Sequence, residues 1–84
     1  MDQDSTRKPM SEAEKRFRKR LGELIARARA RRDLTQAEVA QKMDAPEDTY
    51  RSWEKGRRLP NPFDLLRLSR ILLCPITYFF DMPD

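Results

Sequence analysis

Prolines and glycines divide the second half of this chain into short segments. The breaks fall at Pro46, Gly56, Pro60, Pro62 and Pro75. Proline interrupts helices and central strands because its nitrogen has no hydrogen to donate, and glycine commonly ends a helix. Apolar residues recur at helical spacing between these breaks, and no segment alternates apolar and polar residues over a sustained stretch. The 84 residues are therefore predicted to form an all-α fold with five helices.

The longest helix is predicted at residues 12–32. Its apolar positions fall on one helical face: Phe17, Leu21, Leu24, Ile25 and Ala28. Ser11 and Glu14 have the spacing of a capping box, in which each side chain accepts a hydrogen bond from the other residue's amide. Asp33 tolerates left-handed backbone and is expected to end the helix.

The next two helices are predicted to form a helix-turn-helix unit. Thr35 and Glu38 have capping-box spacing at the start of a helix at about residues 36–42. Pro46 then suits the first turn of a second helix at about residues 47–55. Two short helices joined by so tight a turn are typical of a unit whose second helix enters the DNA major groove.

A fourth and a fifth helix are predicted after this unit. Asn61 is expected to cap the fourth helix, with Pro62 at its first position. The apolar residues of this helix spread over a broad arc: Phe63, Leu65, Leu66, Leu68, Ile71 and Leu72. We therefore expect the helix to be largely buried. Residues 75–80 would form one or two turns of the fifth helix.

Composition excludes several classes of function. The chain has no histidine, so imidazole metal ligands and a Ser-His-Asp triad are impossible. Its one cysteine, Cys74, cannot close an intrachain disulfide or form a zinc site alone. Carboxylate chemistry would remain, but no two acids are paired at a catalytic spacing. We therefore expect no enzyme, no metal and no other cofactor.

The sequence also has no membrane signal. No apolar run approaches the roughly 18 residues that a membrane span needs, and the N-terminus lacks the apolar stretch of a signal peptide. A cytoplasmic protein without a membrane partner is expected. Residues 1–10 are predicted to be a disordered arm, residues 11–81 the folded domain and residues 82–84 a short tail.

Basic residues are concentrated in the first third of the chain. Residues 7–32 hold eleven Lys and Arg against three Glu, whereas the net charge of the whole chain is only +4. Residues 33–84 carry a small acidic excess. A basic block suggests a polyanionic partner, and a solvated helix face is the alternative interpretation.

Three stretches of the sequence resemble the XRE family of phage-repressor and Cro-type helix-turn-helix domains. They are Leu34-Thr35-Gln36-x-x-x-Ala40, Trp53-Glu54-Lys55-Gly56-Arg57-Arg58-Leu59-Pro60 and Pro75-Ile76-Thr77-Tyr78-Phe79-Phe80. The resemblance covers about residues 17–81. It implies a five-helix repressor-like fold and a transcriptional regulator, expected to be a repressor, that binds specific sequences of double-stranded DNA.

By position, the resemblance implies a DNA-binding set in this chain. The set is Gln36, Glu47, Asp48, Arg51, Ser52, Lys55, Arg57 and Arg58. An amide at Gln36 can donate to a phosphate, or the residue is simply exposed in a first turn. Lys55, Arg57 and Arg58 fit phosphate contacts, with solubility as the alternative.

Base contacts are expected from the helix at residues 47–55. Arg51 suits guanine O6 and N7, Glu47 suits cytosine N4, and Ser52 is small enough to approach a thymine methyl. Many family members have a neutral polar residue where this chain has Glu47 and Asp48. Stabilisation of the helix start by two carboxylates is the alternative role of these acids, and two carboxylates near phosphates oppose association.

The resemblance also implies an ion pair, and two residues depart from the family pattern. Arg29 and Glu54 match positions that pair across the first and third helices. Tyr50 stands where an aliphatic core residue is usual, so its ring would pack in the core and its hydroxyl either stays there or reaches a phosphate. Leu73 stands where glycine or asparagine often follows the fourth helix, and Trp53 is expected in the core.

The apolar cluster near the C-terminus has two interpretations. Tyr78, Phe79 and Phe80 either pack the fifth helix onto the first and fourth, or form a patch that joins two copies of the chain. We expect a homodimer through this patch, because two-fold symmetric repressors read paired half-sites. The alternative function is a protein-interaction module on the same fold, such as an antitoxin-like partner with weak or no DNA binding.

Overall fold

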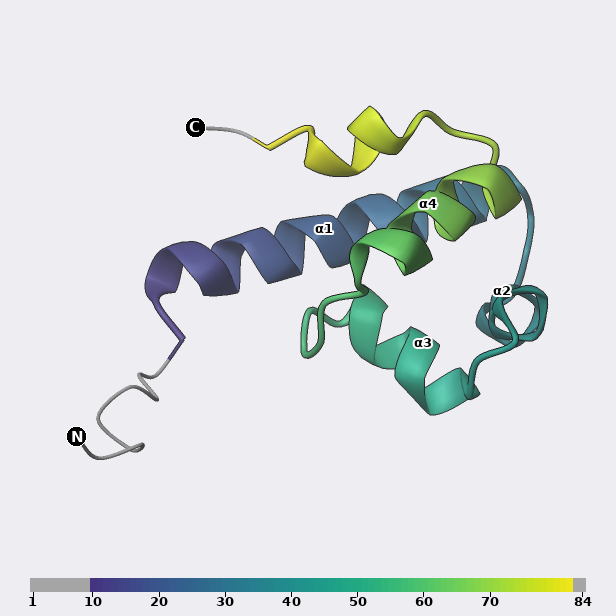
Figure 1. Ribbon diagram of the computed structural model, residues 1–84, viewed down its shortest axis with the longest axis horizontal. Helices are drawn as coiled ribbons and strands as arrows, with labels where there is room; N and C mark the ends of the chain where they lie inside the picture. The colour runs from purple at the N-terminus through teal and green to yellow at the C-terminus, as the bar shows by residue number, and fades with distance from the viewer. Residues whose placement is uncertain (1–9, 83–84) are drawn as a thin grey trace.

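The computed structural model describes residues 10–82, which fold into four α-helices and a 3-10 helix (Figure 1). They are α1 (Glu12–Arg31), α2 (Gln36–Met43), α3 (Glu47–Glu54), α4 (Pro62–Ile71) and η2 (Ile76–Phe80). No strand occurs in this range, so the predicted all-α fold is confirmed. The predicted arm, apart from Met10, and the last two residues of the predicted tail lie outside the described residues.

The fifth element differs from its prediction. Five residues between Pro75 and Asp81 form a 3-10 helix, and no side chain caps its start. A segment this short completes few i to i−4 hydrogen bonds, so the tighter i to i−3 pattern is favoured. The expected five α-helices are therefore four.

Local signals set both ends of α1, although one predicted contact is wrong. The Ser11 hydroxyl accepts from the Glu14 amide at 3.1 Å. The Glu14 carboxylate instead accepts from Arg18 at 2.9 Å, so the described residues contain only half of the predicted capping box. Asp33 has φ 55° just after the helix, in the left-handed region expected for it.

The ends of α2 and α3 are also set locally. Both hydrogen bonds of the Thr35 and Glu38 capping box form, and Asp44 in left-handed backbone ends α2. Pro46 lies at the N-cap of α3 with ψ 143°, not inside the first turn as predicted. Extended backbone at this position separates the two helices by only a short turn. Gly56 follows the last residues of α3 with φ 76°, a left-handed conformation that stops the helix and that glycine adopts readily.

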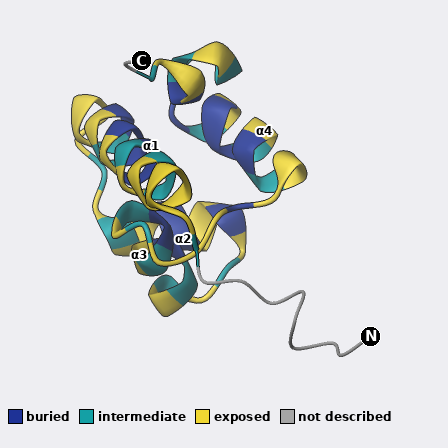
Figure 2. Cartoon of the chain, turned by 90° about the vertical axis from the view of Figure 1, so that its left-hand side faces the viewer, coloured by how far each residue is buried: buried dark blue, intermediate teal, exposed yellow. Residues whose placement is uncertain are grey.

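Only one side of α4 is buried, contrary to the prediction from its broad apolar arc (Figure 2). Leu65 and Leu68 are buried, whereas Phe63 is 64% exposed and Leu66 36%. The buried side contacts α2 and η2. A chain this small has too few elements to cover both sides of a helix. As expected, Asn61 caps α4, accepting from the Asp64 amide at 2.8 Å.

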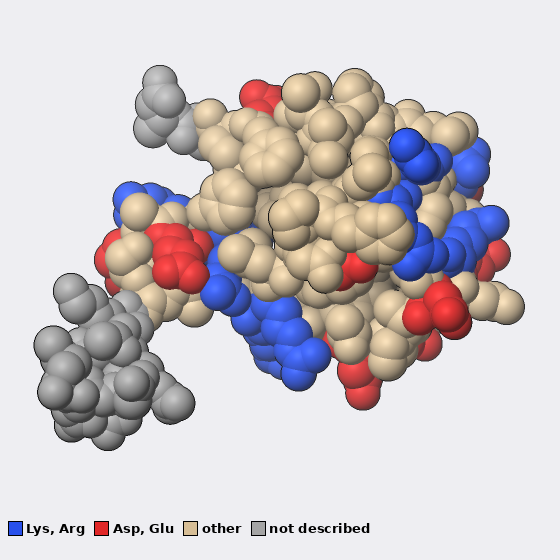
Figure 3. Space-filling model, viewed as in Figure 1, with Lys and Arg blue, Asp and Glu red and all other residues tan. Residues whose placement is uncertain are grey.

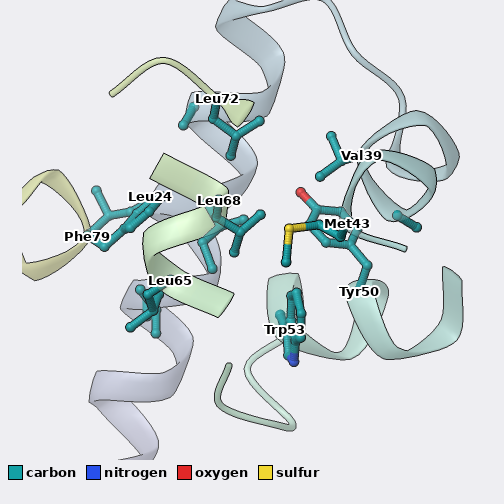
Figure 4. Close-up of a cluster of buried hydrophobic side chains, with 13 residues drawn as sticks. Leu24, Val39, Met43, Tyr50, Trp53, Leu65, Leu68, Leu72 and Phe79 are labelled. Carbon is teal, nitrogen blue, oxygen red and sulfur yellow. The ribbon is translucent and has the colours of Figure 1, made fainter. Parts of the chain in front are cut away.

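The core joins all five elements (Figure 4). Each element contributes buried side chains to it: Leu24 and Ile25 of α1, Val39 and Met43 of α2, Tyr50 and Trp53 of α3, Leu68 of α4 and Phe79 of η2. Phe79 is completely buried and lies beside Leu24. Packing of the last segment onto α1 and α4 is therefore present, and Phe79 is not available to a partner chain.

A glycine allows α1 and α3 to cross closely. A Cβ atom added to Gly22 would lie 2.3 Å from the Glu54 carbonyl oxygen and 2.7 Å from that of Trp53. Backbone atoms fill this space, so no side-chain movement would make room. Gly22 thus fixes how near the end of α3 approaches α1, a role that the sequence did not indicate.

Two further features complete the frame around α2 and α4. Arg67 of α4 donates to the Met43 carbonyl at 2.9 Å and to that of Lys42 at 3.4 Å, which holds the end of α2. Leu73 has φ 55°, so the left-handed turn after α4 persists without the glycine or asparagine that is frequent there. Left-handed backbone costs a leucine about 1–2 kcal/mol.

Residues 10–82 contain neither a membrane-spanning helix nor a cluster of metal ligands. None of its helices is long and apolar enough to span a membrane. Residues 10–82 also bring together no three acidic, histidine or cysteine side chains that would hold a metal ion.

Candidate nucleic-acid interface

Helix α3 packs one side against the core and leaves the other side uncovered. Tyr50 and Trp53 are 0% and 5% exposed, and their rings meet edge to face with centroids 5.9 Å apart. Asp48, Arg51 and Lys55 lie on the exposed side. The inner side chains therefore fix the position of the helix, and the outer ones are free to meet a ligand.

A polar cluster behind α3 connects three helices. Glu54 accepts two hydrogen bonds from Arg29 of α1 in a bidentate ion pair. The distances are 2.6 Å from Nε to Oε2 and 3.1 Å from Nη2 to Oε1. Gln36 of α2 donates to Glu54 Oε1 at 2.9 Å, and the Tyr50 hydroxyl also donates to Glu54. Arg29 further donates to the Leu34 carbonyl at 2.9 Å. These residues brace α3 against both other helices.

The charge states follow from these contacts. Burial raises the pKa of Glu54, but the hydrogen bonds from Arg29, Tyr50 and Gln36 outweigh it and hold the pKa below its ordinary value. The hydrogen bond to Glu54 raises the pKa of Arg29. Burial, with the neighbouring Glu54 carboxylate, raises the pKa of Tyr50. Near neutral pH the cluster is therefore an ion pair with a neutral phenol donor.

This cluster accounts for two residues whose roles were left open. The Tyr50 hydroxyl is directed to Glu54 inside the protein, so the alternative in which it reaches a phosphate is wrong. Gln36 is half-buried, and its amide uses one hydrogen on Glu54. Within residues 10–82 the side-chain amide donates to Glu54 alone.

The first turns of α3 carry a second ion pair. Glu47 Oε2 lies 2.5 Å from Arg51 Nη2, and the two side chains are 39% and 49% exposed. Asp48 is exposed and belongs to none of the ion pairs formed within residues 10–82. Ser52 is half-buried, and its hydroxyl donates to the Thr49 carbonyl of its own helix at 2.6 Å.

The loop after α3 presents basic side chains from a fixed backbone. Lys55, Arg57 and Arg58 are exposed. The Arg57 amide donates to the Ser52 carbonyl at 2.9 Å, and Arg18 of α1 donates to the Arg57 carbonyl at 3.0 Å. Figure 3 shows Lys and Arg side chains gathered at the lower edge, where Figure 1 draws this loop. A loop held at both sides can present its cations to a phosphate backbone.

The expected set thus lies in three places, and the Ser52 hydroxyl is directed to its own helix. Arg51, Glu47 and Asp48 lie on the uncovered side of α3, and Lys55 continues it, whereas Arg57 and Arg58 follow in the loop. Gln36 lies at the start of α2 and belongs to the polar cluster behind α3. Arg18 was not among the expected residues, and only the fold reveals its contact with the loop.

Known protein families were compared with the chain. The model of a family described as HTH_3, helix-turn-helix, matches residues 25–79, well over half of the 84 residues. The match starts within α1 and extends to η2. A search of curated proteins found no match.

Proposed function

We propose, from the premise that the chain belongs to the XRE-type helix-turn-helix family of DNA-binding transcription regulators, that it is a repressor which places α3 in the major groove of its operator. The observation that carries this proposal is the contrast between the two sides of α3. Its inner side is fixed by the core and by Arg29, whereas its outer side carries charged residues that no other helix covers.

The residues divide between base and phosphate contacts in this proposal. Arg51, with Glu47, Asp48 and Ser52 beside it, faces the bases, and Arg51 binds guanine O6 and N7 through two hydrogen bonds. Gln36, Lys55, Arg57 and Arg58 bind phosphates. Such contacts fix the position of the domain on the duplex but read no sequence. Residues 11–81 are the DNA-binding domain, which works in the cytoplasm without catalysis or a cofactor.

A homodimer is the second part of the proposal. Phe79 cannot contribute to it, because the side chain is completely buried. The Tyr78 ring lies beneath Arg31, 5.2 Å from ring centre to guanidinium carbon, and Phe80 is 50% exposed. Phe80 is therefore the residue through which η2 would meet a second copy. Sedimentation of Phe80→Glu against wild type tests this: a dimer that the substitution leaves intact contradicts the assignment.

Selection from random DNA followed by fluorescence-polarisation titration tests the function. Wild type should select a defined operator. Arg51→Ala should weaken operator binding about tenfold or more and relax preference at one position, because a two-pronged base contact is worth about 1–3 kcal/mol. Arg57→Ala should weaken binding to all DNA sequences alike, and it should lower the slope of log K against log salt by about one, the amount expected for one lost phosphate contact. Specific binding unaffected by Arg51→Ala would contradict this reading face.

A different function is favoured by one observation. Glu47 and Asp48 place two carboxylates at the start of α3, and carboxylates near phosphates oppose association. An interaction module on the same fold, such as an antitoxin-like partner, would tolerate this charge. Failure of wild type to bind any DNA at low salt would favour that function.

A further inference from the structure

The exposed ion pair of α3 joins an acid and a base that together are complementary to one G·C base pair. Glu47 and Arg51 lie one helical turn apart on the same side of α3, with Oε2 and Nη2 2.5 Å apart. Within residues 10–82, neither side chain forms an ion pair or a hydrogen bond with another helix. The pair can therefore be opened without disturbing the packing behind α3.

Within this pair Arg51 is neutralised before it meets DNA. A guanidinium held against a carboxylate brings no net charge to a phosphate, and its release leaves Glu47 facing a polyanion alone. Opening an exposed pair costs little free energy. Beside DNA, however, the released Glu47 is repelled by phosphates unless it too finds a partner at the place where Arg51 binds. A phosphate in DNA of any sequence can accept a hydrogen bond from Arg51. The same phosphate has no hydrogen to donate to Glu47.

A G·C pair supplies both partners in the major groove. Guanine presents the acceptors O6 and N7 to a guanidinium, and cytosine presents its N4 amino donor to a carboxylate. We infer that Glu47 and Arg51 act as one specificity-determining unit, which suppresses binding to arbitrary DNA and exchanges its internal partner for a G·C pair in the operator. This inference rests on the proposed function.

Asp48 provides a matched control within the same turn. It has the same charge as Glu47, is exposed and belongs to no ion pair formed by residues 10–82. Asp48→Asn and Glu47→Gln therefore remove the same charge near the same helix start. Only Glu47→Gln also frees a cation.

The first experiment measures binding of the full chain to a random-sequence duplex over a range of salt concentrations. Glu47→Gln should steepen the slope of log K against log salt by about 0.9, because the freed Arg51 binds one more phosphate. Asp48→Asn should strengthen binding without changing the slope. In an Arg51→Ala background the two carboxylate substitutions should have equal effects. Circular dichroism verifies that each variant keeps its helix content.

The second experiment compares the selected operator with a duplex in which the G·C pair read by Arg51 is replaced by A·T. Wild type should lose about tenfold or more in affinity, a usual cost for one wrong pair, and Glu47→Gln should lose clearly less. Equal slopes for Glu47→Gln and Asp48→Asn, or unchanged discrimination in Glu47→Gln, overturn the inference while DNA binding stands. Wild type that binds no DNA at low salt overturns the proposed function and this inference together.

Discussion

The two ion pairs in which α3 takes part have opposite surroundings. Arg29 and Glu54, with side chains 22% and 6% exposed, link α3 to α1 and share Glu54 with Gln36 of α2. Arg51 and Glu47, 49% and 39% exposed, belong entirely to α3. The first pair cannot open without separating helices, whereas the second can change partners. The inner side of the eight-residue helix α3 is thus held rigidly, whereas the ion pair on its outer side can exchange partners.

The buried pair should show by far the larger effect on stability. Arg29→Met leaves the Glu54 carboxylate buried without its cation, and loss of one partner from a buried pair costs about 3–5 kcal/mol. We expect about 3 kcal/mol, because Tyr50 and Gln36 still donate to Glu54. Urea unfolding followed by circular dichroism measures this change. Arg51→Met, the same substitution in the exposed pair, is the control and should cost less than about 0.5 kcal/mol.

The loss of stability at acid pH should reveal the Arg29–Glu54 pair in the wild-type protein. The pKa of Glu54 is lower in the folded chain than its ordinary value of 4.5. Its stabilising contribution is therefore complete above about pH 4.5 and is lost as the pH falls below that value toward the folded pKa. In Arg29→Met this acid loss should shrink or reverse, since the remaining carboxylate is easier to protonate. An unchanged acid limb in the variant would contradict the assignment to Glu54.

Substitution of Gly22, where α1 and α3 cross closely, should have the next largest effect on stability. Gly22→Ala places a methyl group against the Glu54 and Trp53 carbonyl oxygens, and overpacking of this kind costs about 1–3 kcal/mol. We expect about 2 kcal/mol in the free energy of unfolding. Ala26→Gly, on the same helix but half-buried, controls for the change in helix propensity, which is about 1 kcal/mol between these residues.

Removal of one donor from the cluster should have a smaller effect. Tyr50→Phe keeps the ring in the core but removes the hydroxyl that donates to Glu54. A hydrogen bond to a charged group contributes about 1.5–3 kcal/mol, and we expect a loss near the lower limit because Arg29 and Gln36 remain. Thermal unfolding of both proteins measures it. Equal stability would mean that the phenol contributes packing alone.

The exposed pair should have the smallest effect on stability. Glu47→Gln breaks an exposed i, i+4 pair, which contributes about 0.3–0.5 kcal/mol. Its expected consequence lies in the salt dependence of DNA binding instead. A loss of more than about 1 kcal/mol in urea unfolding would show that the outer pair also supports the fold, and the contrast between the two sides of α3 would fail.

Much of the fold was predictable because its signals are local. Thr35 with Glu38, and Asn61 with Asp64, cap their helices through residues three apart, so the sequence itself contains both partners. Asp33 ends α1 through its own backbone preference. By contrast, the exposed side of α4 depended on how many other helices were available to cover it. Phe63 is apolar in sequence but faces outward for that reason.

The places of the candidate DNA-binding residues on their helices were predictable, but their partners within the protein were not foreseen. Glu47 and Arg51 have the i, i+4 spacing of an ion pair, yet each is predicted to contact a base instead. The donation from Gln36 to Glu54 spans two helices, and no spacing indicates it. Arg18 and Gly22 are likewise ordinary residues of a helix until the chain after α3 comes against them.

The position of the single tryptophan gives the protein an internal optical reporter. Trp53 is the only indole in the chain, and it lies on the buried side of α3, edge to face with Tyr50. Its emission therefore senses whether α3 remains docked, and it is shielded from whatever meets the outer side of that helix. One fluorescence spectrum can separate a variant in which α3 has loosened from the core from a variant that has only lost its ligand.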